Sequence, residues 1–478
     1  MSELLGRRRA GILLHLTSLP GREGGTLGAE ARRFVDFLAA GGFSVWQTLP
    51  LGPVDDSRSP YNMKSGRAGN PALIDFDDLS ARGHVSNPAE PPALRLATVY
   101  RGFRDRANAG DKAAFDHYVQ QHRNWLLPYS LFEHQRRRTG TPWWDWPVSL
   151  RQREPAALTA ALAGARDELR NIAFEQYLFD QQWQALRDYA RERGVLLLGD
   201  LPFYVDLDSV DVWWQRRLFE LDALGRPTAV AGVPPDYFNG DGQLWGNPLY
   251  NWAAMRADDF RWWVERLRGQ LRWFDGVRID HFRALESHWA VPANATSARE
   301  GRWAKSPGAE LLTAVRAAIP SLPLVAEDLG TITDEVRRLR DDFGLPGMLI
   351  LQFAFDGSAQ NPYLPANHVR NAVVYTGTHD NDTTLGWYHS LDAHTRAKVD
   401  STLASTPGDM PGGLIRAAYA SPAELAIIPM QDLLALGSEA RMNVPGTPMG
   451  NWRWGFKWSQ LDDELAARLR RLAVLSGR

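Results

Sequence analysis

Short apolar runs that end in polar or charged residues recur along the whole chain. Continuous apolar runs, unlike alternating ones, are typical of strands that are buried on both faces, as in a parallel sheet. The eight runs are Gly11–His15, Val45–Leu49, Val195–Asp200, Gly276–Asp280, Leu324–Glu327, Met348–Phe353, Val373–Thr376 and Ala426–Ile428. They predict a parallel sheet assembled from segments distributed over the entire sequence.

Helical periodicity fills several of the intervals between these runs. The predicted helices are Ala29–Ala40, Ala173–Arg193, Phe260–Arg272, 309–319 and 333–342. Strands and helices that alternate, with eight strands in all, predict the α/β class and a (β/α)₈ TIM barrel. Periodicity alone leaves six strands as an alternative to eight. The tail, Leu461–Arg478, has the pattern of one closing amphipathic helix.

Two intervals are far longer than the others and predict inserted subdomains between barrel strands. Residues 58–193 are mostly helical in pattern, and residues 203–260 are loop-like, especially over Ala231–Gly242. Long loops in a compact domain usually carry function or form lids. We therefore expect one catalytic barrel over residues 1–478, with the second insertion lying as a lid over the active site.

Charge and composition exclude several classes of function. With 54 basic and 56 acidic side chains the net charge is −2, which argues against a nucleic-acid binder that neutralises phosphates. The chain has no Cys, so thiolate metal sites and cysteine nucleophiles are excluded. No stretch reaches the roughly 18 apolar residues that span a bilayer. The apolar run near the start resembles part of a signal peptide, but it is interrupted at His15 and no cleavage site follows, so a cytoplasmic protein is expected. The oligomeric state stays open, and a monomer is compatible with the sequence.

Acidic residues stand at the carboxyl ends of four of the predicted strands. They are Asp200, Asp280, Glu327 and, after the seventh run, Asp380. In a barrel, chemistry takes place at these strand ends. Asp280 and Glu327 would come from adjacent strands, and two carboxyls about 5–5.5 Å apart across an anomeric carbon are what a retaining glycosidase or transglycosylase uses.

The surroundings of these acids suggest different protonation states for them. Arg278 lies two residues before Asp280, so both side chains point to the same face of a strand, and the cation favours the ionised form of Asp280. Asp280 and Asp328 would raise the pKa of Glu327, as an acid/base group requires. The alternative is that the strand-end acids only form salt bridges with Arg.

Motifs from Gly11 to Trp454 give a specific resemblance. They are Leu14–Pro20, Trp46–Pro53, Ser59–Tyr61, Ala68–Pro71, Val230–Phe238, Gln243–Pro248, Arg278–Arg283, Ala326–Gly330, Gly377–Asn381, Pro429–Asp432 and Arg441–Asn443. In this order they resemble the 4-α-glucanotransferases of the amylomaltase type, glycoside hydrolase family 77, in the α-amylase clan. The glycine-rich stretch Gly21–Gly28 departs from the family pattern, outside the catalytic set.

The resemblance implies a role for each site residue. Asp280 would be the nucleophile, Glu327 the general acid/base, and Asp380 the third carboxylate, which binds donor-sugar hydroxyls. Arg278, His379, Asp200 and Tyr61 would form the donor subsite, with Tyr61 stacked under the sugar. Trp245 and the loop around Pro235–Gly242 would cover the cleft, and Asp236 and Asn247 would bind substrate.

The implied activity is retaining transfer of α-1,4-glucan segments from maltooligosaccharides, amylose or glycogen to another glucan or to glucose. The same carboxylates serve hydrolases, so an amylase-like hydrolase is one alternative. A non-catalytic glucan-binding protein is another, and the presence of all three acids argues against it.

No cofactor is expected. The spacing of His281, His288 and His379 matches no metal motif, and no glycine-rich phosphate loop is present. Among the 19 Trp, the Trp143–Trp146 cluster has two interpretations: glucan binding, or packing of the helical insertion, which we favour. The Trp262–Trp263 pair sits in a helical pattern and is predicted to lie in the core.

Overall fold

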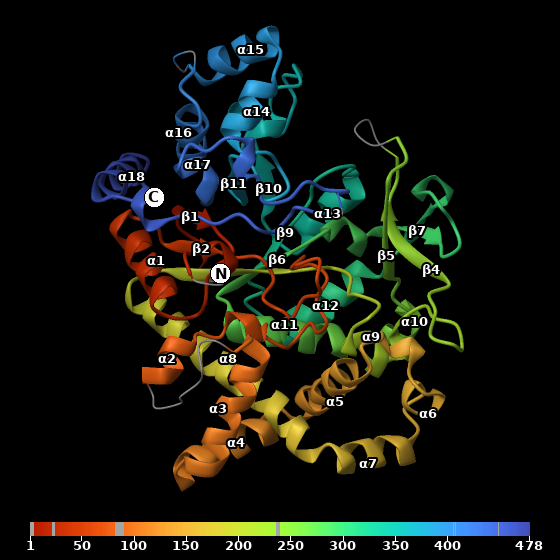
Figure 1. Ribbon diagram of the computed structural model, residues 1–478. Helices are drawn as coiled ribbons and strands as arrows, with labels where there is room; N and C mark the ends of the chain where they lie inside the picture. Colours follow the sequence, from red (N-terminus) through yellow and green to blue (C-terminus); the bar gives the residue numbers. More distant parts are fainter. Residues whose placement is uncertain are drawn as a thin grey trace.

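Eight parallel strands form the centre of the computed structural model (Figure 1), in the order β10-β11-β12-β1-β2-β3-β6-β9. The structure describes residues 4–21, 24–81, 90–235, 240–404, 406, 408–447 and 449–478. Each strand pairs with its neighbour along this order, and the two ends meet where the Ala326 amide donates to the Pro346 carbonyl at 2.9 Å. The predicted (β/α)₈ barrel is confirmed.

All eight apolar runs become barrel strands. Their bounds are Arg9–Leu13 (β1), Val45–Gln47 (β2), Leu196–Leu201 (β3), Gly276–Ile279 (β6), Leu324–Ala326 (β9), Gly347–Ile350 (β10), Ala372–Tyr375 (β11) and Leu425–Pro429 (β12). Side chains on one face, such as Leu198, Val325 and Ile350, fill the barrel interior. Those on the other face, such as Leu197 and Val277, pack against the surrounding helices. Burial on both faces explains why the runs are continuous.

Helices cover the outside of the barrel. The bounds are Ala29–Ala40 (α1), Arg166–Glu192 (α8), Arg261–Trp273 (α11), Gly308–Ala318 (α12), Asp334–Asp342 (α13), Gly412–Ala420 (α16) and Asp463–Leu475 (α18). In α1, the side chains of Ala31, Phe34, Val35 and Leu38 are buried at helical spacing, and Gly42, with φ +77°, follows its end. The predicted helices, including the closing one, are confirmed to within a few residues, apart from the earlier start of α8.

Between β2 and β3 the chain forms a group of helices that lies below the barrel in Figure 1. These helices are Phe76–Ala81 (α2), Pro92–Arg106 (α3), Ala109–Gln121 (α4), Arg123–Thr139 (α5), Val148–Arg151 (α6) and Pro155–Gly164 (α7). Trp143 and Trp146 are buried here, at 0% and 3% exposed. Their indoles pack against Trp144, Phe132 and Trp213. This burial supports packing as their role.

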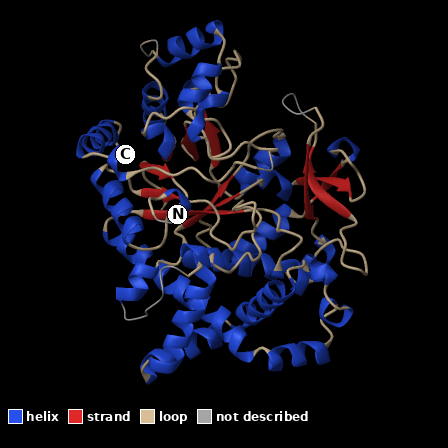
Figure 2. Cartoon of the chain, in the orientation of Figure 1, coloured by secondary structure: helices blue, strands red, loops and turns tan. Residues whose placement is uncertain are grey.

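A separate four-stranded antiparallel sheet, in the order β5-β4-β7-β8, stands beside the barrel (Figure 2). Its strands are Ala229–Val233 (β4), Gln243–Pro248 (β5), Ser287–Pro292 (β7) and Arg302–Lys305 (β8), and the short helices Val210–Trp214 (α9) and Trp252–Arg256 (α10) flank β4 and β5 along the chain. The interpretation of Ala231–Gly242 as loop throughout was wrong over Ala231–Val233. β4 pairs with β5 on one side and with β7 on the other, and β7 comes from a different interval of the chain, so short local periodicity could not show that pairing.

The remaining helices, Thr384–Ser390 (α14), Ala393–Leu403 (α15) and Met430–Leu433 (α17), follow β11 and β12. Trp263 is buried at 1% exposed and Trp262 packs against the same core, as predicted for this pair. Among the residues described, no helix has both the length and the apolar character that crossing a membrane requires.

Candidate active site at the carboxyl ends of the strands

The strand-end acids gather at one end of the barrel. Asp200 lies in β3, and the Asp280 amide after β6 donates to the Leu201 carbonyl at 3.0 Å. Glu327 follows β9, and its amide donates to the Ile279 carbonyl at 3.1 Å. Because β3, β6 and β9 are neighbours, these ladder bonds bring the three carboxylates to one edge.

Arg278 joins two of these acids inside the barrel mouth. Arg278 is 3% exposed, and its Nη1 lies 2.8 and 2.7 Å from the two oxygens of Asp200 and 3.1 Å from Oδ1 of Asp280. The prediction that Arg278 and Asp280 share a face of the strand is confirmed. The pKa of Arg278 is raised well above its usual value, because Asp200 and Asp280 outweigh the opposing effect of burial.

Arg278 lowers the pKa of Asp280, as expected from the sequence, but it does not decide the net shift. Burial raises the pKa of the Asp280 carboxyl well above its usual range; Arg278 opposes the rise, while Asp200 and Glu327 add to it. Arg278 is only one of the groups that act on Asp280. In the folded protein, loss of water and several neighbouring carboxylates outweigh one guanidinium.

Glu327 is held by backbone amides on both oxygens. His281 N donates to Oε2 at 2.6 Å and Leu329 N donates to Oε1 at 3.1 Å. Burial raises the pKa of Glu327 to about 7; Arg278 lowers it and Asp328 raises it. The predicted effect of Asp328 is therefore present, although burial is the larger cause. His281 has a φ of +49°, a left-handed conformation that is uncommon outside glycine, and the turn it makes directs its own amide at Glu327.

Asp328 points away from the cleft. It pairs with Arg340 and accepts a hydrogen bond from Met348 N at 2.8 Å, which also ties the end of β9 to β10. Glu327 and Asp328 are adjacent in the sequence but differ in their contacts: Glu327 lies at the cleft, whereas Asp328 links β9 to β10.

Asp380 is the most exposed of the four acids, with 46% of its side chain accessible. Asn443 Nδ2 donates to its Oδ1 at 2.7 Å, and Arg441 Nη2 donates to its backbone carbonyl at 2.6 Å. His379 Nε2 lies 3.4 Å from Oδ2. Asp380 is therefore fixed by residues from the loop after α17, more than 60 positions along the chain.

Tyr61 links these groups from the loop after β2. Its hydroxyl donates to Asp200 Oδ2 at 2.8 Å and lies 2.8 Å from His379 Nε2. Burial raises the pKa of Tyr61 well above its usual range, with Asp200 adding to the rise, and burial lowers the pKa of His379. Because the Tyr61 O–H is donated to Asp200, the phenol oxygen can only accept from His379, and a neutral His379 with its proton on Nε2 can donate to Tyr61 or Asp380. The two rings stack at 5.4 Å.

The Tyr61 loop is positioned by α8. Gln176 exchanges two hydrogen bonds with the backbone of Gly69, at 2.8 and 2.9 Å. A Cβ at Gly69 would lie 2.2 Å from the ring of Phe179, so only glycine lets the loop approach α8 this closely. The helical insertion thus supports one wall of the site.

The other predicted substrate-binding residues have different surroundings. Trp245 on β5 is 38% exposed, with its ring edge-to-face against His281 at 4.8 Å. Asn247 donates to the Val205 carbonyl at 3.0 Å and so braces the loop after β3. Asp236 lies outside the described residues, and its substrate-binding role stays a prediction.

Among the residues described, no group of three or more His, Asp or Glu side chains is arranged to hold a metal ion. The carboxylates instead face Arg278 and backbone amides. This arrangement suits a carboxylate pair that exchanges protons and attacks carbon.

A sequence profile of glycoside hydrolase family 77, described as 4-alpha-glucanotransferase, matches residues 14–460. A 4-alpha-glucanotransferase of Thermus thermophilus is 46% identical, with 98% of this chain and 99% of the relative covered. One from Synechocystis sp. is 43% identical, with 99% of each covered. The chain belongs to the 4-alpha-glucanotransferase family.

Solved structures agree with this assignment. The amylomaltase from Streptococcus agalactiae in complex with acarbose superimposes with a TM-score of 0.94 at 34% identity, covering 99% of this chain and 100% of that one. The amylomaltase from Corynebacterium glutamicum, at 18% identity and a TM-score of 0.76 over 98% of this chain and 75% of that one, supports the fold alone. This structural similarity agrees with membership of the 4-alpha-glucanotransferase family, to which the sequence motifs pointed.

Sequence reasoning missed Asn443 and Arg441 as parts of the site. Both stand in a motif that carried the resemblance, but they do not follow a barrel strand directly. Their position at the cleft could not be inferred from strand ends, because their loop reaches the cleft only through tertiary folding. Trp452 is a similar case: its ring packs 5.9 Å from both Tyr61 and His379.

Proposed function

We propose that the enzyme transfers α-1,4-glucan segments with retention, through a covalent glucanyl ester on Asp280. The observation that carries this proposal is the contrast between two neighbouring acids. Asp280 has a cation at 3.1 Å, whereas no ion-pair partner of Glu327 occurs in the described part of the chain. Burial raises the pKa of both acids, so the coupled pair retains a proton. Because Arg278 lies beside Asp280, it favours that shared proton on Glu327 and the charge on Asp280.

In the first step, a carboxylate oxygen of Asp280 attacks the anomeric carbon as the bond to the glycosidic oxygen breaks. Glu327 gives its proton to that oxygen, which leaves as the 4-hydroxyl of the released glucan. The product is a β-linked glucanyl–Asp280 ester. A pKa of about 7 leaves about half of Glu327 protonated at neutral pH, so it can act as both acid and base.

In the second step, Glu327 takes the proton from the 4-hydroxyl of an acceptor glucan or of glucose. The acceptor oxygen displaces Asp280, which leaves as a carboxylate, and the new bond is again α-1,4 because two inversions give net retention. Transfer exceeds hydrolysis when the acceptor is oriented and water is poorly placed.

Arg278, Asp200, Tyr61 and His379 are assigned to the donor subsite in this proposal. Their mutual hydrogen bonds hold them without substrate, so little reorganisation is needed on binding. Asp380, the accessible carboxylate, is assigned to donor-sugar hydroxyls. Trp245, partly exposed at the edge of β5, is assigned to the passing glucan chain, with the lid role of residues 203–260 as part of the proposal.

Incubation of the purified enzyme with maltotriose alone tests the reaction type. Transfer produces glucose together with maltopentaose and longer chains, whereas hydrolysis produces glucose and maltose with nothing longer. A product mixture without chains longer than maltotriose would refute transfer. Trapping tests the intermediate: denatured enzyme after brief exposure to substrate should carry a glucanyl group on the peptide that contains Asp280.

A further inference from the structure

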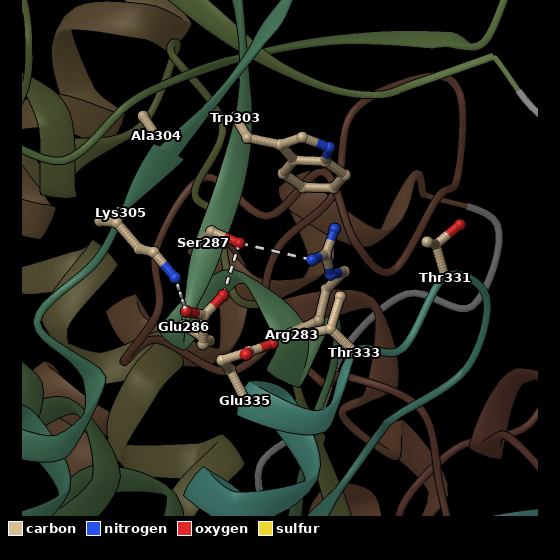
Figure 3. Close-up of a pocket in the computed structure, with 9 residues that line it drawn as sticks. All are labelled: Arg283, Glu286, Ser287, Trp303, Ala304, Lys305, Thr331, Thr333 and Glu335. Atoms are coloured by element: carbon tan, nitrogen blue, oxygen red, sulfur yellow. Dashed lines mark hydrogen bonds and ion pairs between the residues drawn. The ribbon is translucent and has the colours of Figure 1, made fainter.

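A second cavity opens beside the loops that follow β6 and β9 (Figure 3). It encloses about 240 Å³ and is lined from several elements, among them Arg283 after β6, Trp303 on β8, and Thr331 and Glu335 after β9. None of the four strand-end acids lines it. The cavity is therefore a site separate from the carboxylate cleft, yet it shares two loops with that cleft.

Arg283 is the central group of this cavity. The residue is 5% exposed, and its guanidinium lies 3.7 Å from the centre of the Trp303 ring. Nη2 reaches Ser287 Oγ at 3.4 Å, while Nε and Nη1 have no hydrogen-bond partner in the described part of the chain. Unpaired donors on a buried cation are costly, and oxygen acceptors supplied by a ligand would lower that cost.

The charges around the cavity argue against an anionic ligand. Lys305 is paired with Glu286, and Glu335 adds an exposed carboxylate to the lining. The Ser287 hydroxyl lies between Arg283 and Glu286, to which it donates at 2.6 Å (Figure 3), and Thr331 also lines the cavity. Donors, acceptors and hydroxyls with little net charge suit a neutral ligand rich in hydroxyl groups.

Trp303 adds an apolar surface to these polar groups. It is 42% exposed, although it packs edge-to-face on Trp289 at 5.1 Å. An accessible indole beside hydrogen-bonding groups matches a sugar, which has apolar C–H faces and a polar rim. The volume is below the roughly 300–1,000 Å³ of pockets that enclose drug-sized ligands, so a single ring suits it better than a longer segment.

We propose that this cavity is an accessory site for an α-1,4-glucan chain. One glucosyl unit rests against the accessible part of Trp303, and its hydroxyls bond to Arg283 and Thr331. The identity of the ligand rests on the proposed function, while the existence of a site rests on the cavity. A long glucan held here and in the cleft binds at two points, which raises its effective concentration at the cleft.

Calorimetric titration of the Asp280→Asn enzyme with maltohexaose tests binding without turnover. We expect two classes of site, one of which disappears in Asp280→Asn/Trp303→Ala. Leu94→Ala, at a 57% exposed position on α3, is the matched control and should retain both. Thr331→Val, which removes only a hydroxyl from an exposed position, should weaken the accessory class without abolishing folding.

Kinetics give an independent readout in the otherwise native enzyme. Trp303→Ala should lower the ratio of kcat/KM for amylose to kcat/KM for maltotriose about tenfold, a change equivalent to 1.4 kcal/mol. Leu94→Ala should leave this ratio unchanged. A single class of site in Asp280→Asn, or an unchanged ratio in Trp303→Ala, would overturn the proposal. The proposed transfer reaction is tested separately, by the incubation with maltotriose, and failure of the native enzyme to lengthen maltotriose would refute transfer.

Discussion

Replacement of Asn443 by alanine removes the side-chain donor that holds the third carboxylate. In the native enzyme Asn443 Nδ2 lies 2.7 Å from Asp380 Oδ1. A hydrogen bond to a charged group contributes about 1.5–3 kcal/mol. Because 46% of the Asp380 side chain is accessible, water replaces part of this bond, and we take the lower figure. A loss of about 1.5 kcal/mol corresponds to a decrease of about tenfold in kcat/KM.

The assay is the initial rate of glucose release from maltotriose, measured over a range of concentrations so that kcat and KM separate. If Asp380 acts mainly in the transition state, kcat falls more than KM rises. Asn451→Ala is the matched control: it lies in the same loop, and its amide bonds Val444 and Thr447 without touching a strand-end acid. It should stay within twofold of the native rate, an allowance of about 0.4 kcal/mol.

The pH dependence of Asn443→Asp distinguishes a role in positioning Asp380 from a purely structural role, which would not change that dependence. The substitution places a second carboxyl against Asp380, so activity relative to the native enzyme should be low at neutral pH and recover partly in acid, where one of the two carboxyls protonates. Native activity in Asn443→Ala, or an equal loss in Asn451→Ala, would refute the assignment of Asn443 as a positioning residue.

Three further predictions concern the acid, the loop and the core. For native enzyme, kcat/KM should fall above pH about 7, as Glu327 loses its proton, and a kcat/KM that stays constant above this pH would contradict the acid role. Glu327→Gln should be inactive on maltotriose yet still form the ester from α-maltosyl fluoride, whose leaving group needs no proton. Gly69→Ala should lower kcat/KM by forcing the Tyr61 loop away from the Phe179 ring, whereas an unaffected rate would show that the loop relaxes without moving Tyr61. Trp183→Ala, at 1% exposed on α8, should destabilise the fold by about 3–5 kcal/mol, seen as a lower midpoint in urea; a midpoint equal to that of native enzyme would mean that the cavity collapses without cost.

The barrel could be predicted because its signals are local. Each strand is buried on both faces, so its own residues are apolar without interruption, and α1 shows its buried stripe within twelve residues. The antiparallel sheet could not be predicted in the same way. Its strands β4 and β7 lie in different intervals of the chain, and Leu244 and Trp245 on β5 are partly exposed, so their periodicity carries little information.

Some residues of the candidate site could likewise be predicted from local sequence, whereas others could not. Asp280, Glu327 and Asp200 follow from strand ends, because neighbouring parallel strands bring their carboxyl ends together. Asn443 and Arg441 reach Asp380 only after the last barrel strand has returned beside β1, a contact that no local pattern encodes.

The strand-end acids, the apolar runs that become the barrel strands and the family of the enzyme can all be read from the amino-acid sequence. The pKa values of those acids depend instead on the folded protein. Arg278 was visible beside Asp280 in the sequence, but the removal of water and the approach of Asp200 and Glu327 raise the pKa of Asp280 all the same. Proximity of charges along a strand can be read locally, whereas desolvation depends on everything that packs around the group, and so it exists only in the folded protein.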